Sequence, residues 1–193
     1  MNLKGKKIIL GSNSPRRKEL LAGLGIDFIV DTGNTFEEVY DPSTLHVKIP
    51  EVLSEGKSYG FHRELEDDEI LITSDTLVLC ADKVMGKPHS REEAYEMLKL
   101  LSGREHKVIT AITVRDKGRC ITSSDTAIVH FKELSDNEIY HYIDKYKPFD
   151  KAGAYGIQEW IGYIGIGRID GSYFTIMGLP VHMVYQELLN FIQ

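Results

Sequence analysis

The start of the chain follows the order strand, helix, strand, and this order constrains the fold more than any other feature. Residues 7–11 form an apolar run typical of a buried strand, and Ser14 with Pro15 matches a helix N-cap followed by proline at the first helical position. Residues 26–30 predict the second strand. A strand that leads through a helix to another strand is the repeating unit of α/β proteins, so we expect an α/β fold.

The remainder of the chain keeps alternating helix and strand patterns. Capping boxes, with a serine followed three residues later by a glutamate, predict helices after Ser90 and Ser135. A weaker helix pattern follows Pro50, and a last helix is expected from Val181. Apolar or alternating runs bounded by turn residues predict strands at 70–75, 77–80, 84–85, 108–114, 120–131, 161–169 and 173–177. We therefore predict a mixed sheet flanked by helices in a single domain over residues 1–193.

Length and charge limit the classes of function. A chain of 193 residues with 42% hydrophobic content can close a substantial core. Its formal net charge of -6 argues against a general nucleic-acid binder, which usually carries an electropositive stripe. An anionic substrate would then have to be bound by local positive charge.

The cysteines, histidines and apolar runs exclude further classes. Cys80 and Cys120 lie on strand-like runs without the spacing of a metal site or disulfide framework, so we expect reduced core thiols. The seven histidines form no HExxH pattern, which argues against a zinc enzyme. No apolar run approaches the roughly 20 residues of a membrane helix. The polar residues 11–14 also interrupt any signal-peptide core, so we expect a cytoplasmic protein without a membrane partner.

The junction between the first strand and the first helix is a candidate phosphate site. Ser12, Arg16 and Arg17 would bring hydroxyl and guanidinium groups to the unpaired backbone N-H groups of a helix start. The alternative is an ordinary capped surface helix with a solvated basic first turn. Two arginines oppose the helix dipole at this end, and this unfavourable charge is the hint of function. The segment lacks the glycines and the lysine of a Walker loop.

Asp75, at the end of the predicted strand 70–75, is a candidate general base or metal ligand, because strand ends face the crevice in α/β folds. An aspartate that starts a turn is the alternative. Thr76 adds a hydroxyl, and Lys87, between Gly86 and Pro88, could reach a phosphate held near Asp75 or could simply be solvated.

Two loops add further candidates. Residues 31–50 are polar, and Glu37 or Glu38 could complete an oxygen site for Mg²⁺ or Mn²⁺, although a solvated acidic loop would look the same. Residues 150–158 combine small residues with Tyr155 and the amide of Gln158 and could cradle a flat base. An ordinary glycine-containing loop is the alternative there.

Taken in series, six short motifs cover almost the whole chain. They are Leu-Gly-Ser-Asn-Ser-Pro-Arg-Arg at 10–17, Ser-Asp-Thr at 74–76, Gly-Lys-Pro at 86–88, Leu-Ser-Gly at 101–103 with His106, the run 150–158, and Gly-Ser-Tyr at 171–173 with Gly-Leu-Pro at 178–180. In order and spacing the chain resembles the Maf family. The resemblance implies an elongated mixed sheet with two lobes around a central cleft, as in inosine triphosphate pyrophosphatases. It also implies hydrolysis of a nucleoside triphosphate to the monophosphate and pyrophosphate with a divalent metal, Mg²⁺ or Mn²⁺.

The resemblance also implies roles for individual residues. Asp75 matches the family's proton acceptor, and Glu38 matches its loop acid, with Glu37 open as the alternative one residue away. The positions linked to substrate choice match Arg16, Thr76 and Gln158. The polar and basic positions of the phosphate cleft match Ser12, Arg17, Lys57 and Lys87.

The run 150–158 resembles the branch of the family that acts on dTTP and UTP rather than the branch that acts on 7-methyl-GTP. Departures from the family pattern are Ser74, where alanine is usual, Glu159, where glycine is common, and residues 147–149. Glu159 could alter base preference, because it adjoins Gln158. Two other functions stay open: a nucleotide-sensing regulator of cell division, and removal of modified nucleotides. The resemblance also implies a homodimer.

Overall fold

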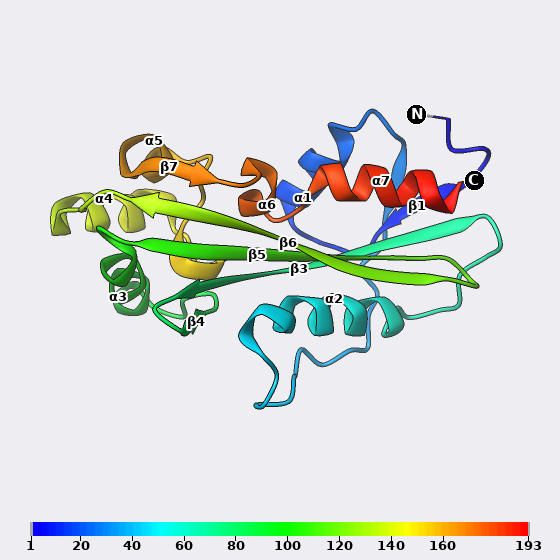
Figure 1. Cartoon of the computed structure of the whole chain (residues 1–193), viewed down its shortest axis with the longest axis horizontal. Helices are drawn as coiled ribbons and strands as arrows, with labels where there is room; N and C mark the ends of the chain where they lie inside the picture. The colour runs from blue at the N-terminus through cyan, green and yellow to red at the C-terminus, as the bar shows by residue number, and fades with distance from the viewer. Residues whose placement is uncertain (1, 193) are drawn as a thin grey trace. The chain divides into compact units, whose positions relative to one another are not determined.

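The computed structural model describes residues 2–192, and these fall into two compact units. Unit 1 takes in the described residues of Met1–Asp75, Thr110–Asp125 and Gly178–Gln193. Unit 2 consists of Thr76–Ile109 and Thr126–Met177. Hydrogen-bonded strands follow the order β2-β1-β3-β5-β6-β7, with β4 paired to β3 (Figure 1). Parallel and antiparallel pairs both occur, so the predicted α/β class with a mixed sheet is confirmed.

Unit 1 begins with the predicted strand, helix and strand. Strand β1 (Lys7–Leu10) leads to helix α1 (Pro15–Ala22) and then to the short strand β2 (Phe28–Val30). The Ser14 side chain caps α1 by accepting a hydrogen bond from the Arg17 backbone N-H, as the sequence predicts. Strand β1 pairs in parallel with β2 and also with β3 (Glu69–Cys80).

Two longer helices pack on the strands of unit 1. Helix α2 (Ile49–Tyr59) follows the 3-10 turn η1 (His46–Lys48), and helix α7 (Val181–Phe191) follows Pro180. Figure 1 shows α2 on one face of the strands and α7 on the other. Ile9, Phe61, Leu65 and Leu71 form a buried cluster in this unit. The strands of unit 1 therefore lie between α2 and α7, next to a packed apolar cluster.

Strand β3 is longer than the sequence predicts. It runs without a break from Glu69 to Cys80, so the prediction that a strand ends at Asp75 is wrong. Asp75 and Thr76 are half-buried and interrupt the apolar pattern, but the backbone continues as a strand, because β3 also pairs with β5 and, from Val78 to Cys80, with β4. Asp75 consequently projects from inside a strand rather than from a loop.

Unit 2 contains the predicted hairpin and capped helices. Strand β4 (Lys83–Met85) pairs antiparallel with the end of β3 across Ala81 and Asp82, which both have positive φ. Helix α3 (Arg91–Leu101) is capped by Ser90. Helix α4 (Asp136–Tyr146) has the complete capping box of Ser135 and Glu138. These local signals were sufficient to place both helices.

The long strands β5 (Glu105–Arg115) and β6 (Cys120–Phe131) join through the predicted turn, where Asp116 Oδ1 accepts hydrogen bonds from Gly118 N and Arg119 N. Strand β7 (Ile166–Asp170) pairs antiparallel with β6. Both cysteines are free thiols, with Cys80 buried and Cys120 half-buried, so the predicted core position holds fully only for Cys80.

The predictions of strands at 161–169 and 173–177 are largely wrong. Residues Trp160–Gly165 form helix α5, only Ile166–Asp170 is a strand, and Tyr173–Met177 forms helix α6. The apolar and glycine residues here alternate, which mimics a strand. In the fold, Gly162 packs so closely on the Ile157 carbonyl oxygen that a side chain would collide with it, and a local pattern cannot reveal such a contact.

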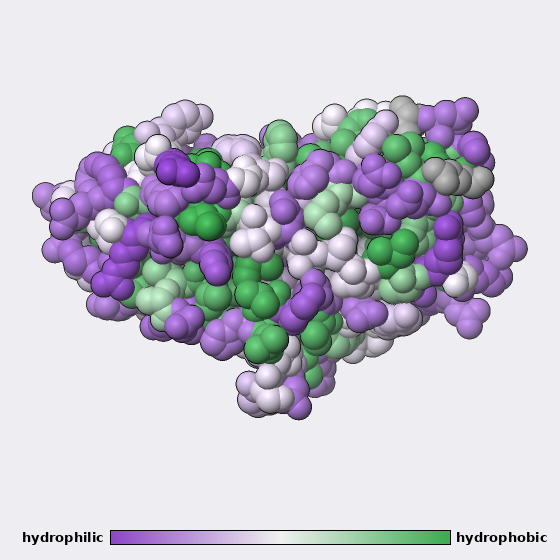
Figure 2. Space-filling view, viewed as in Figure 1, coloured by the Kyte–Doolittle hydropathy of each residue, from purple (hydrophilic) through white to green (hydrophobic). Residues whose placement is uncertain are grey.

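Hydrophilic residues cover much of the face shown in Figure 2, with apolar residues between them. Several exposed apolar side chains lie in the loop before α2, among them Val39, Tyr40 and Leu45. Across residues 2–192, every helix is too short or too polar to cross a membrane.

Candidate functional site

The pairing between β1 and β3 ends at a row of polar side chains in unit 1. The last paired residues are Leu10 and Ile72, after which Gly11 N donates to the Ile72 carbonyl and the first chain segment leaves the sheet. Ser12 then follows β1, while β3 continues without β1 beside it. The carboxyl ends of parallel strands are where α/β proteins usually place their ligands.

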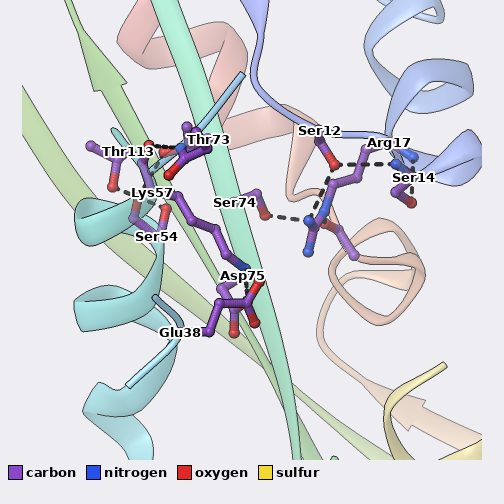
Figure 3. A network of polar contacts seen from close by, with 12 residues as sticks. Ser12, Ser14, Arg17, Glu38, Ser54, Lys57, Thr73, Ser74, Asp75 and Thr113 are labelled. Atoms are coloured by element: carbon purple, nitrogen blue, oxygen red, sulfur yellow. Dashed lines mark hydrogen bonds and ion pairs between the residues drawn. The ribbon is translucent and has the colours of Figure 1, made fainter. Parts of the chain in front are cut away.

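The Arg17 guanidinium is held at this edge by hydrogen bonds to Gly178 and Ser12. Its Nε donates to the Gly178 carbonyl at 2.8 Å, and its Nη1 lies 3.4 Å from Ser12 Oγ (Figure 3). Ser74 Oγ donates to the same Gly178 carbonyl at 3.2 Å. The predicted pair Ser12 and Arg17 is therefore brought together, and Ser74, which the sequence analysis noted only as a departure from a family pattern, supports it.

The surroundings of the Arg17 guanidinium disfavour its positive charge. Desolvation lowers the pKa of its guanidinium even though part of the side chain is exposed, and the nearby Asp75 carboxylate opposes this shift. Arg16 lowers the pKa of Arg17 further, because it brings a like charge. A desolvated cation next to a second cation is an arrangement that favours an anionic ligand.

Lys57 joins two carboxylates into the second group of the site. Its Nζ lies 2.5 Å from Asp75 Oδ1 and 3.0 Å from Glu38 Oε1 (Figure 3). The side chains of Lys57 and Asp75 are mostly buried, at 18% and 14% exposed, whereas Glu38 is 60% exposed. The Lys57 carbonyl also accepts a hydrogen bond from Asn34 Nδ2 at 2.6 Å, which ties the preceding loop to α2.

The alternation of β3 explains why Lys57 meets Asp75. Thr73 and Asp75 are two residues apart on a strand and so share a face, while Ser74 points to the other face. Thr73 Oγ1 donates to the Ser54 carbonyl at 2.7 Å, and Ser54 Oγ lies 2.9 Å from Thr113 Oγ1 on β5. Because Lys57 follows Ser54 by three residues on α2, anchoring Ser54 on Thr73 aligns Lys57 with Asp75.

The residues 2–192 contain no group of three or more His, Cys, Asp or Glu side chains arranged to hold a metal ion. Two carboxylates, Glu38 and Asp75, do converge on the Lys57 ammonium group. Of the neighbours Glu37 and Glu38, it is Glu38 whose carboxylate makes this contact. Two oxygen ligands are enough for Mg²⁺ when substrate phosphates and water complete its coordination.

Thr76, Lys87 and Gln158 belong to unit 2. Thr76 follows Asp75 directly in β3 and is half-buried, and Lys87 is exposed just after β4. Gln158 lies in the loop before α5, and its Oε1 is buried without a hydrogen-bond partner among the described residues. A buried acceptor without a donor is costly, so this oxygen is suited to receive a donor from a ligand.

The loop around Gln158 rests on Tyr142, which the sequence analysis did not single out, and on residues to which it gave no supporting role. Tyr142 from α4 donates its hydroxyl hydrogen to Glu159, and Lys151 Nζ lies 3.1 Å from the same carboxylate. His106 Nε2 lies 2.8 Å from the Tyr155 hydroxyl, and burial holds the pKa of His106 at about 4. The sequence signals were His106 and Tyr155 within the family motifs, Lys151 within the loop and the unusual Glu159.

Chemically, unit 1 offers half-buried cations beside a carboxylate that can accept a proton, and unit 2 offers a loop with an unused buried acceptor. The first combination is suited to phosphate oxygens and to activation of water.

Comparisons with known proteins give a consistent result. The family model described as Maf-like protein matches residues 7–191. The chain is 50% identical over 190 residues to the dTTP/UTP pyrophosphatase of Parabacteroides distasonis, with 98% of each chain covered. It is 48% identical over 189 residues to the dTTP/UTP pyrophosphatase of Bacteroides thetaiotaomicron, with 97% of each covered. Among solved structures, a HAM1 protein from Coxiella burnetii aligns with a TM-score of 0.41 and 15% identity, over 65% of this chain and 73% of that one.

Proposed function

This chain belongs to the Maf-like family, and from that membership we propose that it is a nucleoside triphosphate pyrophosphatase acting on dTTP and UTP. The products are the nucleoside monophosphate and pyrophosphate. The observation that carries the proposal is the contact of Lys57 with both Asp75 and Glu38 next to the desolvated Arg17. The printed names of the similar proteins support the choice of substrate.

Asp75 is the proposed general base. It takes a proton from a water molecule whose oxygen attacks the α-phosphorus, the bond from that phosphorus to the bridging oxygen breaks, and pyrophosphate leaves with the bond electrons. Its position supports this role, because the carboxylate is held by Lys57 and is 14% exposed. A general base contributes about 10²- to 10⁴-fold to such a reaction.

The triphosphate is proposed to bind the cationic side chains. Ser12, Arg16, Arg17 and Lys57 from unit 1, with Lys87 from unit 2, supply hydroxyl and cationic groups for phosphate oxygens. Support comes from Arg17, whose Nε and Nη1 are already oriented by Gly178 and Ser12. Phosphoryl transfer depends mostly on positioning and on neutralising the oxygens, so these groups should affect rate more than stability.

Mg²⁺ or Mn²⁺ is the proposed cofactor. Glu38 and Asp75 fit such an ion, because their carboxylates both lie against Lys57 Nζ and Glu38, at 60% exposed, has room to turn toward a bound ion. The ion would neutralise phosphate charge when bound. Lys57 would retain its contact with these carboxylates or pass to a phosphate oxygen.

Recognition of the base is proposed to involve Gln158, with Arg16 and Thr76. Uracil and thymine both carry an N-H at N3, and the buried Gln158 Oε1 has no donor among the described residues. An N3-H would satisfy that oxygen, whereas cytosine has a lone pair at the same position. Gln158 therefore supports a preference for uridine and thymidine nucleotides.

The experiment that tests the function is pyrophosphate release by the purified protein with Mg²⁺ or Mn²⁺. The substrates are UTP, dTTP, 5-methyl-UTP, CTP and 7-methyl-GTP, and EDTA removes the metal. Turnover of UTP and dTTP that EDTA abolishes is the expected result. Nucleotide binding without turnover would instead identify a sensor, and turnover of only 7-methyl-GTP would overturn the base assignment.

Compartment and assembly complete the proposal. We place the activity in the cytoplasm, where its nucleotide substrates occur, and we expect the homodimer that the family resemblance implies. Light scattering of the purified protein gives the molar mass, and a mass near 21.9 kDa would contradict the dimer.

A further inference from the structure

Tyr142 connects helix α4 to the loop that carries Gln158. Its side chain is fully buried. The hydroxyl donates to Glu159 Oε2 and accepts a hydrogen bond from the Gly156 backbone N-H at 3.0 Å. Burial raises the pKa of Tyr142 well above its ordinary value, as does the Glu159 carboxylate, so the hydroxyl keeps its proton as a donor. One phenol therefore holds the loop at two positions.

Lys151 uses the other oxygen of Glu159. Its Nζ lies 3.1 Å from Glu159 Oε1 and 2.7 Å from Asp150 Oδ1, and the lysine side chain is only 8% exposed. A buried ammonium group without a counter-ion is costly, and Glu159 is the less exposed of the two carboxylates that balance the charge of Lys151. The carboxylate thus receives Tyr142 on one oxygen and Lys151 on the other.

The loop backbone packs directly on this ion pair. A side chain added at Gly156 would start 3.0 Å from Glu159 Cδ and 3.1 Å from Lys151 Cε, which is tighter than ordinary contact. Further along the loop, Gly153 has φ of 69° and donates its N-H to the Gly86 carbonyl at 3.0 Å. The loop is consequently fixed near its beginning, its middle and its end.

Gln158 lies between two of these fixed points. It precedes Glu159 and follows Gly156 by two residues, and Glu159 N donates to the Gly156 carbonyl at 3.0 Å. The position of the unpartnered Gln158 Oε1 is therefore determined by a short turn whose two ends both contact Tyr142.

We propose that Glu159, held by Tyr142 and Lys151, is a positioning residue that sets the base preference of the enzyme by fixing Gln158. The inference rests on the proposed function, since it concerns the choice between uracil and cytosine. None of the three residues needs to contact the reacting phosphorus. Their removal should move the Gln158 amide and weaken its discrimination of an N3-H from a lone pair, while leaving the groups of unit 1 unchanged.

The test compares kcat and KM for UTP and CTP in Tyr142→Phe, Glu159→Ala and Glu159→Gln. For Tyr142→Phe and Glu159→Ala we expect the ratio of kcat/KM for UTP over CTP to fall about tenfold, mostly through a higher KM for UTP. Glu159→Gln keeps an oxygen acceptor for Tyr142 and should lose less. Tyr140→Phe, on the same helix and stacked on Tyr95, is the matched control and should keep the wild-type ratio.

The outcomes separate the two proposals. If the wild type releases no pyrophosphate from UTP, the proposed function fails. If the wild type turns over UTP but the variants keep its UTP-to-CTP ratio, only the positioning role is wrong. Partial unfolding would lower activity toward both nucleotides equally and leave the ratio unchanged. Should Tyr142→Phe not fold, Glu159→Ala carries the test because it removes the contacts with both Tyr142 and Lys151, and an unchanged UTP-to-CTP ratio in that variant overturns the inference.

Discussion

Asp75 lies inside β3 and meets a lysine that comes from another element. From the sequence, Asp75 is proposed as a base or metal ligand because it is expected to end an apolar strand, but the strand continues through it to Cys80. A residue inside a strand has little freedom of movement, so the carboxylate keeps its direction while substrate binds. The proposed base is thereby held in position before the reaction begins.

Replacement of Asp75 by asparagine tests the proposed base. The asparagine side chain is similar in size and can interact with Lys57 through its amide oxygen, so we expect the Asp75→Asn chain to fold and to bind nucleotide. The kcat for UTP should fall about 100-fold or more, because the amide cannot accept the proton. Steady-state kinetics and calorimetric titration with UMP measure the two effects. Glu37→Gln is the control, and a near wild-type kcat for Asp75→Asn would remove Asp75 from this role.

His106 should make the stability of the fold depend on pH. Burial, and then the nearby His130, hold its pKa at about 4, against about 6.5 for an ordinary histidine. Between these values the unfolded chain binds a proton that the folded chain does not. The contribution of His106 to the free energy of unfolding should therefore be constant above about pH 6.5. As the pH drops toward 4, the free energy of unfolding should fall by up to about 3 kcal/mol.

Urea unfolding at several pH values checks this dependence. His106→Gln removes the titrating group, and its amide can still bond to Tyr155. We expect a flatter pH profile for this variant than for wild type, whatever its absolute stability. His46→Gln, at an exposed position, should keep the wild-type slope. Parallel profiles for wild type and His106→Gln would show that this histidine does not contribute.

At the scale of helices and strands, the sequence predicted those features that depend on contacts between residues close together in the chain. The caps of α1, α3 and α4 and the hairpin turns were found in the sequence because each motif is complete within a few residues. The anchoring of α2 was not predictable, since Ser54 contacts Thr73 and Thr113 at separations of 19 and 59 residues. Likewise, nothing local distinguishes Tyr142 from Tyr140, and only the fold brings Tyr142 to Glu159.

The Thr73→Val variant tests whether the hydrogen bond from Thr73 to Ser54 on α2 sets the position of Lys57. The valine keeps the shape of threonine but cannot donate to the Ser54 carbonyl. We expect a loss of about 1 kcal/mol in unfolding free energy and a higher KM for UTP. Thr122→Val is the matched control, because Thr122 bonds to Thr113 and not to the helix. An equal rise of KM in both variants would contradict a specific role of the Thr73 contact.

At the scale of the whole molecule, three strands belong to both compact units. Strands β3, β5 and β6 each contribute residues to unit 1 and to unit 2 (Figure 1). Neither unit could unfold without disrupting strands on which the other depends. The prediction of a single domain over residues 1–193 therefore implies that the two units unfold together in one cooperative transition.

We expect one unfolding transition for the complete chain. Trp160 is the only tryptophan and belongs to unit 2, so its fluorescence follows that unit. Far-UV circular dichroism follows helices of both units. Coincident urea midpoints from the two signals are the expected result, and a circular dichroism change that clearly precedes or follows the fluorescence change would mean that the units unfold separately.

The alternation of side-chain direction along β3 also limits which insertions and deletions its gene can accept. Ser74 supports Arg17 through Gly178, and Asp75 contacts Lys57, because adjacent residues of a strand face opposite ways. A point substitution in β3 changes one side chain and leaves the direction of the others unaltered. A codon inserted between Thr73 and Ser74 would turn both Ser74 and Asp75 to the opposite face of the sheet and break both contacts, so we expect this part of the gene to keep its length.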